Sequence, residues 1–152
     1  VLLPGTPYQA SSASEFPLSP RTMAILFFCA ILSLCIGQLV LLKKRLLWLN
    51  YCIILLYSLL GFILTAMIFS KHPTVNVNLQ ILILNPLFLF LAFPKLRFAW
   101  RHYVMLTFIA LYFIGNAIQS YAEGMNIMAL SLLVIVVTDL LFERYSHLIG
   151  KK

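Results

Sequence analysis

Long apolar runs separated by short polar clusters dominate this sequence. The runs at about 22–42 and 46–69 each hold some 20 residues or more, enough at ~1.5 Å rise per residue to cross a ~30 Å hydrocarbon core. Two further runs, at about 103–121 and 125–142, have nearly the same length. The pattern therefore predicts four membrane-spanning helices and leaves one weaker segment to be decided.

That weaker segment, at about 79–93, is shorter and is interrupted by Asn85-Pro86. It reads either as a short kinked span or as a re-entrant loop. With five spans and an external N-terminus, nine of the eleven Lys and Arg residues face the cytoplasm, and only Arg21 and Lys71 lie outside. A re-entrant segment would leave only three inside, so the positive-inside rule favours a fifth span.

The predicted fold class is therefore all-α, a polytopic membrane bundle of five transmembrane helices with a periplasmic N-terminus and a cytoplasmic C-terminus. Residues 1–20 form a Pro/Ser-rich periplasmic linker, 21–146 the five-helix domain, and 147–152 a basic cytoplasmic tail. Trp48 and Trp100 fall at the predicted cytoplasmic interface, where indole rings prefer to lie. An external N-terminus also predicts that an exported domain precedes this chain.

Composition excludes a water-soluble domain. Hydrophobic residues make up 62% of the chain and charged residues 10%, with a mean hydropathy of +1.00. The positive charges behind the net charge of +7 lie in short clusters between the apolar runs. This pattern is typical of loops that set the orientation of membrane helices, and it does not predict a nucleic-acid partner. Cys29, Cys35 and Cys52 lie inside apolar runs and are expected to be inert thiols. No metal site and no cofactor is predicted, because no ligand spacing or glycine-rich phosphate loop occurs.

Polar residues on the predicted outer side are the candidate contacts for lipid or for a catalytic domain. A lysine there would attract a phosphate headgroup, and amides would orient ester carbonyls. The alternatives are amides that bond neighbouring helices, an Asn85 that serves backbone groups freed by Pro86, and a His72 that is an ordinary interfacial histidine and not a general base. The candidates are Lys71, His72, Thr74, Asn76, Asn78, Asn85 and Asn116.

Toward the cytoplasmic side, Asp139 is the one acid inside a predicted span that stands out. A proton relay would need a chain of acids across the bilayer. We therefore predict that Asp139 forms a structural pair with an Arg or Lys at the cytoplasmic end. A small transporter or channel is a further, less favoured alternative, since no inverted repeat or filter sequence is present.

The string FSKHPTVNVNLQ at 69–80, followed by ILILNPL, resembles the C-terminal membrane domain of Lnb-like proteins, a bacterial family of lipoprotein N-acyltransferases and relatives. The resemblance implies a location in the bacterial inner membrane and a periplasmic domain upstream that carries the catalytic Cys and His, so no catalytic residue lies in this chain. It also implies a phospholipid acyl donor and a lipoprotein amine as acceptor. We expect a membrane-anchoring, lipid-presenting domain; the alternative is a non-enzymatic anchor or assembly subunit that packs against a partner membrane protein.

Overall fold

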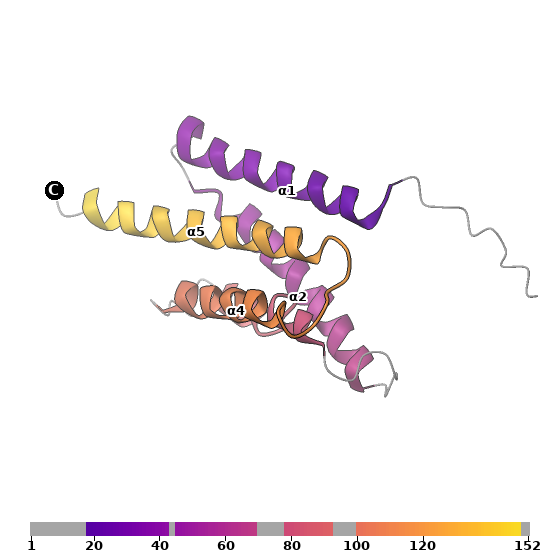
Figure 1. The fold of residues 1–152 in the computed structure, drawn as a ribbon. Coiled ribbons are helices and arrows are strands. Elements are labelled where there is room, and N and C mark those ends of the chain that lie inside the picture. Colours follow the sequence, from indigo (N-terminus) through magenta and orange to yellow (C-terminus); the bar gives the residue numbers. More distant parts are fainter. Residues whose placement is uncertain (1–17, 43–44, 70–77, 93–99, 150–152) are drawn as a thin grey trace, which may run out of the picture.

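The computed structural model describes residues 18–42, 45–69, 78–92 and 100–149, and all regular structure in them is helical (Figure 1). This confirms the all-α prediction. In chain order the elements are α1 (Pro20–Ile36), η1 (Gly37–Leu42), α2 (Leu47–Phe69), η2 (Leu79–Leu82), α3 (Phe88–Ala92), α4 (Arg101–Gly115) and α5 (Met125–Ile149).

Three of these helices are long and apolar enough to cross a membrane. They are Pro20–Leu41, which covers α1 and most of η1, then α2, and the Met125–Arg144 part of α5, with 22, 23 and 20 residues. Ser19 begins the first of them: its hydroxyl accepts the Thr22 N–H at 3.2 Å, and Pro20 occupies the first turn, where its missing N–H costs nothing. α5 runs seven residues beyond the predicted end at 142, because a helix continues past the end of its apolar stretch when no breaking residue follows.

The helices α1 and α5 run side by side in the same direction, and α4 runs antiparallel to α5 on its other side (Figure 1). α2 crosses behind them and packs against α3 and η2. The main core lies where α2, α4, α5 and the 79–92 segment meet. Its fully buried members include Tyr57, Ile83, Phe88, Tyr112 and Leu132.

The bundle has two chemically different ends. At the entry end, the start of α1 lies against the 116–124 connection: a Cβ on Gly124 would meet the Ala24 Cβ at 3.0 Å and the Pro20 carbonyl oxygen at 3.1 Å. Gly124 has a φ of 87°, a conformation that side chains disfavour. At the opposite, charged end lie Arg45, the start of α4, and the last described charged residues of α5.

The 79–92 segment is not one continuous helix. A short 3₁₀ turn, η2, is followed by an irregular turn through Asn85-Pro86 and then by the five residues of α3. The Leu79 N–H bonds the Gln119 side chain at the entry end (2.9 Å), whereas Leu91 lines a small cavity at the charged end. The segment thus runs beside α4 from one end of the bundle to the other.

The helix predicted over 103–121 also differs from the structure. α4 begins at Arg101 and ends at Gly115, six residues early. The apolar run continues past this point, but the Gln119 amide oxygen is used to bind the backbone of Leu79, and residues 116–124 turn toward α1. The shorter helix therefore reflects a tertiary contact that hydropathy does not register.

Candidate functional site

Four of the predicted outer site residues, Lys71, His72, Thr74 and Asn76, lie outside the described residues. The other three, Asn78, Asn85 and Asn116, are described. Asn78 begins η2 at the entry end, and its side chain accepts the Gln80 N–H at 3.0 Å. Asn116 is exposed and caps the C-terminus of α4.

Asn85 is buried, and it acts on its own backbone. Its side-chain oxygen accepts the Leu87 N–H at 2.9 Å, which fixes the turn around Pro86. The Pro86 carbonyl in turn accepts the Ser58 hydroxyl of α2 at 2.9 Å. The Asn85 amide oxygen thus serves a backbone N–H of the turn that follows it, and a role for Asn85 in lipid or domain contact stays a prediction. Asn78 and Asn116 thus lie at the same end of the bundle, next to the close approach of Leu79 and Gly115, whereas Asn85 is buried.

Aromatic side chains fix the entry end. Tyr112 and Tyr121 stack with ring centroids 4.2 Å apart, and the Tyr121 hydroxyl donates to the Tyr112 carbonyl at 2.8 Å. The Tyr112 hydroxyl donates to the Asn126 side chain at 3.0 Å. These contacts hold the connection between α4 and α5 against both helices, and so fix the surface around the start of α1.

The densest cluster of buried polar groups among the described residues lies instead at the charged end. Arg45 binds Asp139 with two parallel hydrogen bonds, of 3.0 Å from Nε and 2.7 Å from Nη2. The Asp139 side chain is 5% exposed. This fork geometry is the strong form of an Arg–carboxylate pair. It confirms the predicted pairing of Asp139 with a cation at this end.

Two amide side chains extend the hydrogen bonding of this ion pair to η1 and α2. Asn50 donates to Asp139 at 2.5 Å, and Gln38 donates to Asn50 at 3.3 Å while accepting the Leu46 N–H at 2.9 Å. Gln38 belongs to η1, a π-helical stretch, and such stretches are rare and mostly form single wide turns within α-helices. Here the wider turn accompanies a Gln38 side chain that is 1% exposed and reaches the start of α2.

α4 joins the cluster through two consecutive residues. His102, 2% exposed, has Nδ1 3.0 Å from Glu143 Oε2, without hydrogen-bond alignment, and Nε2 3.9 Å from Asp139 Oδ2. Arg101 lies 3.6 Å from the other Glu143 oxygen. Two carboxylates thus face two guanidinium groups, so the cluster is charge-balanced when the imidazole is neutral. We call these residues and their amide partners the charged-end network: Gln38, Arg45, Asn50, Arg101, His102, Asp139 and Glu143.

Sequence reasoning recognised part of this network. It predicted that Asp139 pairs with a cation, but it did not link Glu143 to Asp139, although their i, i+4 spacing on α5 was a signal that the two share one helix face. His102 gave no such signal, because its neighbours in sequence are ordinary interfacial residues. The network connects all four long elements in a low-dielectric setting, where a satisfied set of polar groups specifies one packing. Within the described ranges no group of three His, Cys, Asp or Glu residues is arranged to hold a metal ion.

Three long apolar helices, joined at one end by buried ion pairs, define a multi-pass α-helical membrane domain. The chain belongs to the family described as the Lnb transmembrane domain, whose model matches residues 11–146. This confirms the resemblance seen at 69–87. Comparisons with curated proteins and with solved structures gave no match.

Proposed function

We propose that this chain anchors a periplasmic acyltransferase-like domain of the same polypeptide and presents membrane lipid to it. The membrane-anchoring part follows from the family and the apolar helices. The observation that supports the remainder is the meeting of three segments at the entry end. The start of α1, Asn78 at the end of the HPTVNVN stretch, and the 116–124 connection converge there.

These three segments would form one surface on which an upstream domain can pack. A domain that enters through residues 1–17 arrives beside the 116–124 connection, which also contacts Leu79. The tyrosine stack and the close approach of Gly124 to Ala24 hold the connection against α1 and α4. Tethering beside the membrane raises the local concentration of lipid for such a domain. The acyl donor in this proposal is a phospholipid, and the acceptor is the amine of a bacterial lipoprotein.

The proposal includes five membrane crossings, with the entry end outside and the charged end in the cytoplasm. It is supported by the path of the 79–92 segment, whose two ends lie at opposite ends of α4. A segment with extended turns rises more per residue than an α-helix, so 14 residues reach further than their number suggests. A re-entrant loop would instead return to the end where it began.

Cysteine accessibility tests the crossing. In a variant without Cys29, Cys35 and Cys52, we expect Thr74→Cys to react with a membrane-impermeant maleimide in intact spheroplasts. Arg97→Cys should react only after the membrane is permeabilised, because the 79–92 segment lies between these positions. External labelling of Arg97→Cys as fast as that of Thr74→Cys would show that the segment does not cross. Lys151→Cys serves as the cytoplasmic control.

The lipid-presenting role is tested by His72→Ala in the full-length protein. We expect acyl transfer to lipoprotein N-termini, measured by mass spectrometry of the terminal peptide, to fall roughly a hundredfold, the cost of losing a group that positions the substrate. Membrane abundance should not change. His147→Ala, in the C-terminal part, is the matched control. Unchanged transfer in His72→Ala would reduce this histidine to an interfacial role, and an upstream region without a Cys/His domain would favour the non-enzymatic anchor.

A further inference from the structure

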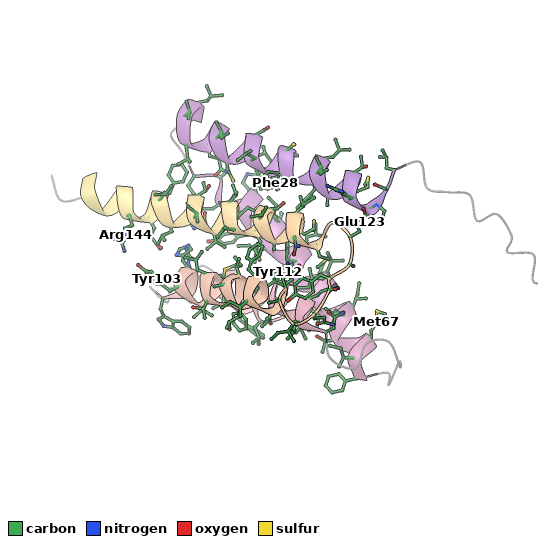
Figure 2. All side chains as sticks on the ribbon, in the orientation of Figure 1. Phe28, Met67, Tyr103, Tyr112, Glu123 and Arg144 are labelled. Atoms are coloured by element: carbon green, nitrogen blue, oxygen red, sulfur yellow. The ribbon has the colours of Figure 1, made fainter. Side chains whose placement is uncertain are left out.

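An apolar groove runs along the exposed face of α4. It lies away from the entry end, where we placed the lipid-presenting surface of the proposed function. Its volume is about 220 Å³, and its wall is made by residues spaced along one helix face: Trp100, Tyr103, Val104, Thr107, Phe108 and Leu111. The groove begins at the charged end with two aromatic residues and continues toward the middle of the bundle. Figure 2 shows Tyr103 at this end of α4, near Arg144 of α5.

The groove is preformed. Phe108 is held from behind by an edge-to-face contact with Phe88, with ring centroids 6.0 Å apart. The Thr107 hydroxyl donates to the Tyr103 carbonyl at 2.9 Å, so this side chain contributes a methyl group and no free donor to the groove. The groove is therefore lined almost entirely by apolar atoms.

Its length fits one acyl chain of one leaflet. From Trp100 to Leu111 the helix rises about 16 Å, and half of a ~30 Å hydrocarbon core is about 15 Å. A transmembrane helix from a partner would run the whole depth of the bilayer and extend beyond this groove. The dimensions therefore favour a single lipid chain that enters from the charged end.

The head of the groove carries a positive charge. Arg144 is exposed, and its Nη2 donates to the Tyr103 hydroxyl at 2.8 Å. Arg45 and Arg101 at the same end face carboxylates, whereas in the described part of the chain no carboxylate pairs with Arg144. A guanidinium beside an aromatic interface residue suits a phosphate, which it can bind with two parallel hydrogen bonds.

We propose that this groove is a binding site for an anionic phospholipid of the leaflet at the charged end, with an acyl chain along α4 and the phosphate on Arg144. The site differs from the lipid-presenting surface of the proposed function, which lies at the entry end. In the five-span topology it faces the cytoplasmic leaflet. The lipid held here is a structural ligand and not the acyl donor.

Tryptophan quenching tests the site directly, because Trp100 lines the groove. In a Trp48→Phe background, the full chain is reconstituted in phosphatidylcholine nanodiscs with increasing fractions of acyl-brominated phosphatidylglycerol or acyl-brominated phosphatidylcholine. We expect half-maximal quenching of Trp100 at a roughly fivefold lower fraction of phosphatidylglycerol. This is the ratio that ~1 kcal/mol for one cation near the membrane surface gives at ~1.4 kcal/mol per tenfold.

Two variants separate the site from general attraction to a basic protein. Arg144→Gln should bring the ratio to about one, whereas Arg21→Gln, the exposed cation at the start of α1, should leave it unchanged. Equal quenching by the two lipids in the parent chain, or a preference that survives Arg144→Gln, would overturn the proposal. Absence of quenching by either lipid would also overturn it, since the groove would then be covered by protein, such as a second copy of this chain.

Discussion

Replacing Asp139 with alanine should lower the free energy of unfolding by roughly 3–5 kcal/mol, the range seen when one partner of a buried ion pair is removed. The substitution leaves the Arg45 guanidinium without its carboxylate and takes an acceptor from Asn50. It also removes the carboxylate nearest to His102 Nε2. Unfolding in detergent by a denaturant titration, or the thermal midpoint of the purified chain, measures the loss.

Two further variants make the result specific. Glu123→Ala removes an exposed carboxylate from the connection between α4 and α5 and should cost less than about 0.5 kcal/mol, as surface changes usually do. The double variant Arg45→Met, Asp139→Leu should recover most of the stability, because apolar replacement of a whole buried pair is often neutral. An Asp139→Ala variant as stable as Glu123→Ala would show that the charged-end network does not hold the bundle together.

Adding a single methyl group at Gly61 should lower stability by about 2–3 kcal/mol, toward the upper part of the range for overpacked sites. A Cβ at this position would lie 2.6 Å from the Leu84 carbonyl oxygen, 2.7 Å from its carbon and 2.9 Å from Pro86 Cδ. Two of these three atoms belong to the backbone, so no side-chain rotation relieves the clash. The Gly61→Ala variant is expected to push the 79–92 segment away from α2 and to break the bond from Ser58 to Pro86.

Gly37→Ala is the matched control, because a Cβ there meets nothing within 4 Å. In a helical element this change should be neutral or should add about 0.5–1 kcal/mol by restricting the unfolded chain. The measurement is the thermal midpoint of both variants, with limited proteolysis to detect exposure of residues 78–92. Equal stability of the two variants would mean that the close approach at Gly61 is not a feature of the folded protein.

The long helices could be predicted from the sequence because a lipid environment constrains the order of residues along each helix. A helix that crosses a membrane needs an unbroken apolar stretch, and the runs predicted at 22–42 and 46–69 agree closely with α1–η1 and α2. The segment at 79–93 was harder, because its conformation depends on neighbours. Gly61 permits α2 to approach, and Ser58 supplies a donor for the Pro86 carbonyl. Neither residue is near the segment in sequence.

The candidate site shows the same division. The sequence predicted that Asp139 would find a cation at the charged end, since an unpaired carboxylate in a membrane helix is costly. It did not identify Arg45, which lies 94 residues away, and it passed over His102 altogether. It directed attention to the outer polar residues, of which Asn85 proved to serve a local turn.

By itself, then, the sequence determined the class of protein, the approximate helices of its long spans and the family to which it belongs. Those properties depend on the order of apolar and polar residues along the chain, which hydropathy and motif similarity read directly. The interruption at Asn85-Pro86 was visible in the sequence, but only the tertiary structure decided how the 79–92 segment turns there and that α4 ends at Gly115. It also decided that the buried polar groups converge on Asp139, because which side chains meet depends on how the helices face one another, and that orientation is not encoded in any single stretch of the chain.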